Sequence, residues 1–301
     1  MRARDLIDFV LLAALWGASF LFMRVAAPEF GPFALMFMRC AIGAAVLLPI
    51  CLLRGSMPAL GQAWQPVAFV GLINSAIPFA LFGYAALQLP AGMISVLNST
   101  APFFGVLIAF AWLGERLSRW QTLGLLLGFT GVVGLIMSGG RLDLTSSRAL
   151  YWGVAAALLA AASYGLAASF MRRYLSGIDS LAGATGSQLS ATVLLALPGL
   201  LFWPAEAPSM TAWLAVIVLG TLSTGLAYLL YFRLIANMGP GRAITVTFAI
   251  PVFGIFWGAV VLGELVTGLM VLGAVLVVAG CALTTGALPL KRRAGNAAGK
   301  T

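Results

Sequence analysis

The stretch PFFGVLIAFAWLGE, at residues 102–115, decides the fold, because it occurs again in altered form as PVFGIFWGAVVLGE at residues 251–264. Both copies begin with a proline, keep a Phe-Gly pair and end on Leu-Gly-Glu after an apolar run. Apolar runs of the same kind continue in both directions along the chain. The runs and their repetition together predict the architecture.

The composition excludes a soluble domain. Of the 301 residues, 62% are apolar and 8% charged, against roughly 45–50% and about 25% in soluble proteins. A helix of roughly 20 apolar residues crosses a bilayer core about 30 Å thick. Ten such runs occur, near 6–25, 33–53, 66–88, 91–113, 119–138, 150–171, 180–203, 211–236, 241–263 and 267–287. We therefore expect an all-α integral membrane protein with ten transmembrane helices, surrounded by the lipid bilayer.

The net charge of +9 is explained by topology. If both termini are cytoplasmic, 13 of the 17 basic residues lie inside, three lie outside (Arg24, Arg141, Arg148) and Arg39 lies within a span. Cytoplasmic loops of membrane proteins carry such an excess of Lys and Arg. The pattern predicts a multi-pass protein of the bacterial inner (cell) membrane with both termini cytoplasmic, and no nucleic-acid partner.

The repetition extends over nearly the whole chain. A shift of 148 residues places Trp16-Gly17 on Tyr164-Gly165, and a shift of 149 places Leu48-Pro49 on Leu197-Pro198. Each unit holds five spans, an odd number, so the second copy is inverted relative to the first, as in many secondary transporters. The expected divisions are a first repeat over 1–138, a linker over 139–149, a second repeat over 150–288 and a basic cytoplasmic tail over 289–301. Two inverted halves permit alternating access, although duplication can also simply enlarge a bundle.

These residues resemble a known family, the drug/metabolite transporter superfamily in its two-repeat EamA-type branch. The resemblance covers residues 6–287 and is carried by Trp16-Gly17-Ala18-Ser19-Phe20, Arg39, Pro102, Leu113-Gly114-Glu115, Pro251 and Leu262-Gly263-Glu264. It implies an exporter of small metabolites. The chain is also similar to the YddG-type exporters of aromatic and other amino acids, by general likeness rather than by a motif.

Polar and aromatic side chains within the spans are the candidates for substrate binding, because polar groups in a membrane usually face a cavity or the bundle interior. The cavity candidates are Trp16, Arg39, Asn74, Phe79, Tyr84, Ser95, Asn98, Ser99, Ser163, Tyr164, Gln188, Tyr228, Thr245 and Phe248, accompanied by Ser75, Ser187 and Thr224. Pro78, Pro102 and Pro251 are expected to kink their helices, since proline removes an amide donor. Three alternatives remain: hydroxyls that bond their own backbone, an Arg39 that snorkels outward, and aromatic rings that only pack.

The sequence lacks the residues that several kinds of functional site require. The chain has no His, and Cys40, Cys51 and Cys281 show no CxxC spacing, so neither a metal site nor a disulfide is expected. The eight acidic residues fall at span ends or in loops, which leaves no deep proton relay; Glu115 and Glu264 are expected to be end caps or gate contacts. No phosphate-binding loop occurs. We expect no cofactor and no catalytic residue, with a membrane-embedded enzyme or a channel as the rival classes.

Glycines concentrate in the fifth and tenth spans, where small faces allow close helix packing. Gly254 and Gly258 form a GxxxG in the ninth span, which favours tight internal packing and at most a weak homodimer. The sequence therefore predicts a monomer or weak homodimer that exports small metabolites. Amino acids are the favoured cargo, and a multidrug exporter of hydrophobic cations is the alternative.

Overall fold

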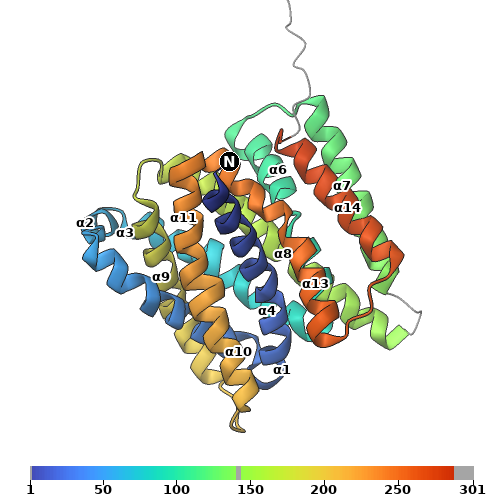
Figure 1. Cartoon of the computed structure of the whole chain (residues 1–301), viewed down its shortest axis with the longest axis horizontal. Helices are drawn as coiled ribbons and strands as arrows, with labels where there is room; N and C mark the ends of the chain where they lie inside the picture. Colours follow the sequence, from blue (N-terminus) through green and yellow to red (C-terminus); the bar gives the residue numbers. More distant parts are fainter. Residues whose placement is uncertain (1, 140–143, 288–301) are drawn as a thin grey trace, which may run out of the picture.

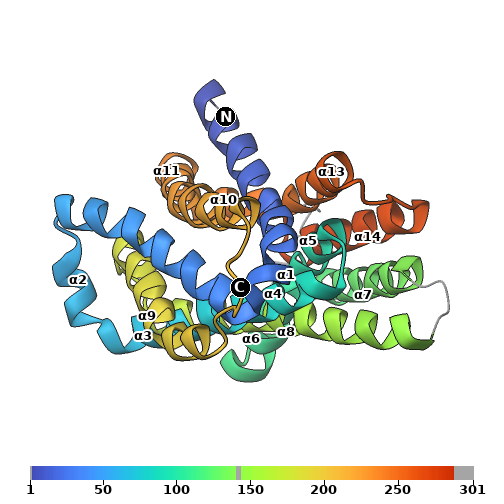
Figure 2. The ribbon, with the colours of Figure 1, turned by 90° about the horizontal axis from the view of Figure 1, so that it is seen from below.

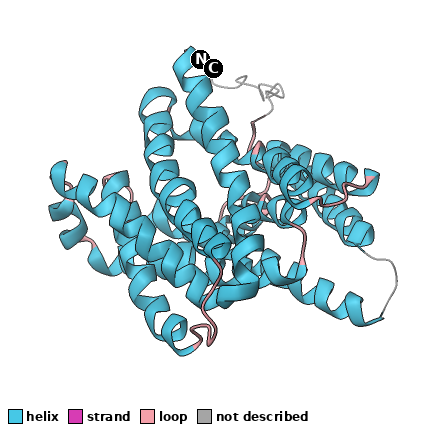
Figure 3. Cartoon of the chain, turned by 60° about the horizontal axis from the view of Figure 1, so that its bottom comes forward, coloured by secondary structure: helices cyan, strands magenta, loops and turns pink. Residues whose placement is uncertain are grey.

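The computed structural model of the chain describes residues 2–139 and 144–287, which form helices joined by short loops (Figure 3). The first part holds α1 (Ala3–Leu53), α2 (Met57–Gln62), α3 (Trp64–Gly71), the π-helical turn η1 (Leu72–Ala76), α4 (Ile77–Gln88), α5 (Ala91–Asn98), α6 (Ala101–Leu113) and α7 (Arg119–Gly139). The second part holds α8 (Leu144–Tyr174), α9 (Ser180–Leu201), α10 (Met210–Gly220), the π-helical turn η2 (Thr221–Leu226), α11 (Ala227–Met238), α12 (Pro240–Ala243), the 3-10 helix η3 (Ile244–Phe248), α13 (Ile250–Leu262) and α14 (Gly268–Thr284).

The chain is a multi-pass membrane protein. Within the described ranges, eight helical segments are long and apolar enough to cross a bilayer, and α14 is a shorter apolar helix of 17 residues. The all-helical prediction is confirmed. The basic tail predicted over 289–301 and residues 140–143 of the predicted linker lie outside the described residues.

Helix α1 is too long for a single crossing. Its 51 residues span about 76 Å at 1.5 Å per residue, more than twice the roughly 30 Å of a bilayer core. Gly31, with φ 68° and ψ 166°, breaks the helical conformation between Pro28 and Pro32, so α1 is two helices joined at this point. The predicted runs 6–25 and 33–53 lie on either side of the break.

Helix α8 extends into the linker predicted over 139–149. Helix α7 continues to Gly139 and α8 already begins at Leu144, six residues before the expected start at 150. Hydropathy reveals only the apolar part of a helix, and residues 144–149 are mostly polar. The helix therefore begins before its apolar signal does.

Helix α1 is the central element of the packing. It contacts α4 in the first part and α9, α10 and α13 in the second. Its first half passes between α11 and α13 (Figure 1), and its second half runs outward to α2 (Figure 2). Side chains on α1 thus meet both parts of the chain.

Helices α7 and α14 lie side by side at one edge of the molecule (Figure 1) and pack backbone against backbone. A Cβ on Gly131 would lie 2.8 Å from the carbonyl oxygen of Gly273, and a Cβ on Gly273 would lie 2.8 Å from that of Gly131. The same reciprocity joins Gly124 and Gly280, at 2.6 Å each way. Glycine supplies the small surface that such contact needs, as predicted for these two spans.

Candidate functional site

Arg39 is buried in the middle of the molecule, with 6% of its surface exposed. Its Nε donates a hydrogen bond to Thr224 Oγ1 at 3.1 Å, and Nη1 lies 3.9 Å from Met23 Sδ. The guanidinium carbon stands 3.8 Å from the centre of the Phe79 ring. Arg39 therefore points inward, and the snorkelling alternative is wrong.

These contacts only roughly offset the cost of the buried charge. An arginine at the centre of a membrane helix costs about 2.5–3.5 kcal/mol on insertion scales. A desolvated cation–π contact returns about 2 kcal/mol and a hydrogen bond about 1 kcal/mol. The ion pairs found among residues 2–139 and 144–287 are Arg172–Glu115 and Arg233–Asp8. Arg39 thus has no acidic partner in the described part of the chain.

Gln188 of α9 lies in the same region and is fully buried. Its Nε2 donates to Ser75 Oγ at 3.2 Å, and Ser75 Oγ lies 3.0 Å from Ser187 Oγ. Tyr228 adjoins the side chains of Gln188 and Asn74. The Gln188 Oε1 atom has no hydrogen-bond partner in the structure, which leaves a buried acceptor unused.

Aromatic rings surround these groups. Tyr164 and Tyr228 lie close enough to Arg39 to interact with its charge, and the Tyr164 ring lies 5.9 Å from that of Phe82. We call the following set the polar cluster: Arg39, Asn74, Ser75, Phe79, Tyr164, Ser187, Gln188, Thr224 and Tyr228. It combines a cation, amides, hydroxyls and aromatic faces from seven helices or turns, which suits a small molecule with both polar and apolar parts.

Two π-helical turns supply part of the polar cluster. Asn74 and Ser75 lie on η1 and Thr224 lies on η2, beside Ser223, whose buried hydroxyl also has no partner. Such turns shift the helical register locally and frequently occur at functional sites. The kink expected at Pro78 coincides with η1, which ends just before this proline.

Three candidate residues use their hydroxyls on their own backbone. Ser95 donates to the Gly92 carbonyl at 2.6 Å, Ser99 to the Ser95 carbonyl at 3.2 Å, and Thr245 to the Arg242 carbonyl at 2.6 Å. This is the local bonding that competes with a binding role. For these hydroxyls the structure favours the alternative interpretation.

The other candidates are spread around the polar cluster. Ser163 donates to the Ile73 carbonyl at 2.6 Å, which ties α8 to η1. The Trp16 ring lies 5.2 Å from that of Tyr231. Asn98 and Phe248 are half-buried, and Tyr84 is 37% exposed on α4.

The predicted kinks at Pro102 and Pro251 are interruptions rather than bends. The chain leaves the helix at Ser99 and Thr100, between α5 and α6, and at Ala249, between η3 and α13. A proline two residues into the following helix has no amide to lose there. The break exposes the Ser99 carbonyl, which accepts a hydrogen bond from Cys281 Sγ at 2.7 Å.

The segment before Pro102 is tightly packed. Residues 91–97 of α5 are all buried, and a Cβ on Gly254 of α13 would overlap Ser95. The Glu264 carboxylate accepts hydrogen bonds from the amides of Ala91 at 2.8 Å and Gly92 at 3.3 Å. A negative charge is favoured at a helix N-terminus, so Glu264 caps the N-terminus of α5.

The related segment before Pro251 is open. Pro240, Gly241, Arg242 and Ile244 are all exposed on α12 and η3. A Cβ on Gly241 would meet nothing within 4 Å. Glu115, which corresponds to Glu264, forms an ion pair with Arg172 instead. Related sequences are therefore packed at one end of the molecule and unpacked at the other.

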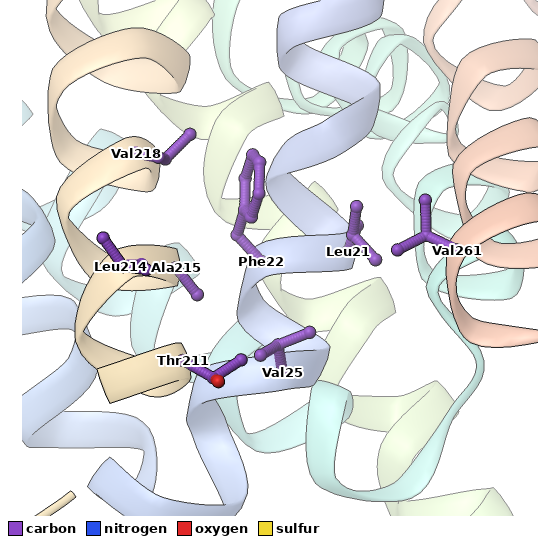
Figure 4. Close-up of a pocket in the computed structure, with 8 residues that line it drawn as sticks. All are labelled: Leu21, Phe22, Val25, Thr211, Leu214, Ala215, Val218 and Val261. Atoms are coloured by element: carbon purple, nitrogen blue, oxygen red, sulfur yellow. The ribbon is translucent and has the colours of Figure 1, made fainter. Parts of the chain in front are cut away.

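An apolar groove of about 220 Å³ lies between α1, α10 and α13 (Figure 4). Its lining is aliphatic or aromatic apart from Thr211 and consists of Leu21, Phe22, Val25, Thr211, Leu214, Ala215, Val218 and Val261. None of the predicted cavity residues lines it. The groove suits an apolar occupant and is separate from the polar cluster.

The model of the EamA-like transporter family matches residues 6–137 and again residues 151–286. The chain belongs to this family. It is similar to the "Uncharacterized transporter YvbV" of Bacillus subtilis (strain 168), with 25% identity over 92% of this chain and 90% of the relative. It also resembles the "Uncharacterized inner membrane transporter YedA" of Escherichia coli (strain K12), with 26% identity over 93% and 94%.

The chain is also similar to a named exporter and to a solved structure. The "Probable terminal-alkyne amino-acid exporter" of Streptantibioticus cattleyicolor is 25% identical over 91% of each chain. A solved structure entitled "Crystal structure of protein" is 24% identical, with a TM-score of 0.64 over 95% of this chain and 98% of that chain. The latter shows the fold alone.

Sequence reasoning missed Ser223 and Met23, a neighbour of Arg39. Ser223 stands 149 residues after Asn74, so the repeat register would have marked it. For Met23 the sequence holds no comparable signal, because apolar side chains in a span are ordinary.

Proposed function

We propose that this EamA-like transporter is a secondary transporter that exports small metabolites, with aromatic and other neutral amino acids as its expected cargo. It works by alternating access through a central cavity between two inverted five-helix repeats, residues 1–138 and 150–288, in which α1 supplies two of ten spans. The observation that carries this proposal is the contrast between the packed α5 and the exposed α12–η3 segment.

Contacts that recur at a fixed offset support the inverted repeats. Arg39 bonds Thr224, and Gln188 bonds Ser75; both Gln188 and Thr224 stand 149 residues after their counterparts Arg39 and Ser75. Contacts that exchange in this way are those expected across a two-fold axis.

Close backbone contacts recur in the same way. Gly17 packs against Phe253, where a Cβ would lie 2.6 Å from the Phe253 Cβ. Gly165 packs against Phe104, with the corresponding distance 2.9 Å. With five spans in each unit, the axis lies in the membrane plane.

The excess of basic residues supports a cytoplasmic position for the exposed α12–η3 end. An exporter must accept its cargo from that side, so this conformation is the loading state. The topology can be tested with single cysteines at Arg54 and Ser209, which should react with an impermeant reagent from opposite sides. Reaction of both from one side would contradict ten spans.

Energy for transport is expected to come from the substrate's own gradient. The acidic residues fall at span ends or in loops, and proton relays in transporters usually need Asp, Glu or His within the membrane. The name of the Streptantibioticus relative supports amino acids as the substrate class. The apolar groove favours a second candidate, export of hydrophobic cations.

Efflux from proteoliposomes tests the proposal. Vesicles containing the purified protein are preloaded with aromatic or aliphatic amino acids and diluted with and without an imposed pH gradient. We expect amino-acid efflux that needs no pH gradient. If hydrophobic cations leave while amino acids stay, the drug-export function replaces it.

A further inference from the structure

Arg39 and Gln188 occupy related positions but carry different chemistry. Each donates to a hydroxyl of the other half, Thr224 or Ser75. Each also adjoins an aromatic ring, since Arg39 lies over Phe79 and Gln188 adjoins the Tyr228 side chain. The scaffold around the two positions is therefore alike, and only the side-chain ends break the symmetry.

Arg39 offers hydrogen-bond donors and a charge that the described part of the protein does not neutralise. Its contacts use Nε toward Thr224 and Nη1 weakly toward Met23 Sδ. A guanidinium presents five N–H donors in a planar fork that matches a carboxylate. The complement of this group is an anion with two oxygen atoms.

Gln188 offers the opposite character close by. Its buried Oε1 accepts no hydrogen bond from residues 2–139 or 144–287, and a Cβ on Gly43 would lie 3.7 Å from that oxygen. Gly43 is one turn from Arg39 on the same face of α1, about 6 Å along the axis. The Thr224 side chain reaches both positions, because it accepts from Arg39 and lies 2.7 Å from the same Gly43 Cβ position. An unused acceptor and an unneutralised cation thus lie one helical turn apart.

We propose that Arg39 binds the carboxylate of the exported molecule and that Gln188 Oε1 accepts a hydrogen bond from its ammonium group. This assignment rests on the proposed export function and narrows the substrate class to zwitterionic α-amino acids. The rings of Phe79, Tyr164 and Tyr228 would then receive the apolar side chain. Arg39 and Gln188 are specificity-determining residues, one for each charge of the zwitterion.

The test compares three related compounds in proteoliposomes. Phenylalanine has both charges, phenylalaninamide lacks the carboxylate, and 3-phenylpropionate lacks the ammonium; protein-free liposomes give the passive leak of each. Wild-type protein should export phenylalanine at least about tenfold faster than either analogue, because a site built to bond a group rejects ligands without it. Arg39→Gln should abolish the preference over phenylalaninamide, and Gln188→Ala the preference over 3-phenylpropionate.

Two matched variants separate specificity from structure. Arg24→Gln removes another arginine of α1, which bonds the Ala86 carbonyl at 2.8 Å, and should leave the order of the three compounds unchanged. Arg39→Lys keeps the charge without the fork and should retain part of the preference. If Arg39→Gln does not fold, thermal stabilisation of the wild type and of Arg39→Lys by each compound replaces the efflux comparison.

The outcomes distinguish this inference from the proposed function. If wild-type protein exports phenylalanine and phenylalaninamide equally, the inference is overturned while amino-acid export stands. The inference is also overturned if folded Arg39→Gln slows the export of all three compounds by the same factor. That result would show that Arg39 has a structural role only. If no amino acid moves at all, the proposed function fails and takes the inference with it.

Discussion

Residues 91–98 and 240–248 precede related prolines in the two halves, yet the structure treats them differently. The first segment is the regular helix α5, buried against α13 and held at its N-terminus by Glu264. The second divides into α12 and the 3-10 helix η3, and four of its nine residues are exposed while two are buried. Related sequences can therefore adopt two packings, which is the property that alternating access requires.

One residue difference makes the two ends chemically unequal. Position 240, related to Ala91, is a proline and has no amide hydrogen to donate. If the α12–η3 end closed in the manner of α5, Glu115 would find only the Gly241 amide, whereas Glu264 has two amide donors. We therefore expect the end at α5, held by Glu264, to be the more firmly closed of the two.

The largest effects should come from a contact that does not differ between the halves. Gly131→Ala and its counterpart Gly280→Ala place a Cβ 2.8 Å and 2.6 Å, respectively, from a backbone oxygen of the facing helix, where no side chain can move aside. Each should cost about 3 kcal/mol. Thermal unfolding of the purified protein should show similar losses for both, and a large inequality would break the two-fold description of α7 and α14.

A moderate effect should separate the two ends. Gly254→Ala places a Cβ against the Ser95 side chain, including its Cβ, and should cost about 2–3 kcal/mol, because that atom is fixed to the α5 backbone. Its counterpart Gly105→Ala meets only the Gly165 Cα, at 3.8 Å, and gains helix propensity of up to about 1 kcal/mol. Thermal unfolding of both variants measures this difference. Equal destabilisation would show that the two ends are packed alike.

A smaller effect should follow from weakening the contact at α5. Glu264→Gln removes the charge that faces the Ala91 and Gly92 amides and should cost about 1 kcal/mol, or about fivefold in the closed-to-open ratio. A cysteine placed at Met93, buried in α5, should then react faster with a thiol reagent. An unchanged rate would remove Glu264 from the gate.

The smallest effect is expected at the corresponding acid. Glu115 and Arg172 form an ion pair in which both side chains are more than half exposed, and such surface pairs contribute about 0–1 kcal/mol. Glu115→Gln should leave thermal unfolding nearly unchanged. A loss as large as that of Glu264→Gln would mean that Glu115 also serves a closed end in this conformation.

Much of the fold could be predicted because the membrane restricts the choices. Apolar runs of helical length predicted every long helix, and the proline pair at Pro28 and Pro32 lies where α1 breaks. The glycines of the fifth and tenth spans predicted close packing of these helices, but not that α7 and α14 pack against each other. These features depend on local composition, which can be read directly from the sequence.

The remaining features depend on tertiary contacts. The turn η2 has no nearby proline from which it could be predicted, whereas η1 lies before Pro78. The Leu-Gly-Glu motif is identical in both halves, so it cannot tell which end is packed. The inward direction of Arg39 is decided by Phe79 and Thr224, on elements far away in the chain.

The binding roles of the polar cluster stay predictions, whereas its assembly is visible in the structure. Asn74 and Gln188 lie beside Tyr228. Ser95 and Thr245 instead bond their own backbone, a choice that hydroxyls in helices make through local geometry. Sequence position alone could not distinguish these two uses of a polar residue.

Cysteine labelling at related positions of the two ends tests the central claim most directly. In a variant whose native cysteines Cys40, Cys51 and Cys281 are replaced by alanine, single cysteines at Met93 and Arg242 are treated with an impermeant maleimide in right-side-out and inside-out vesicles. We predict that the Arg242 position reacts only in inside-out vesicles and that the Met93 position is protected in both. Equal reaction of the two positions, or reaction of Met93 from outside with Arg242 protected, would contradict a transporter closed at α5 and open to the cytoplasm at α12.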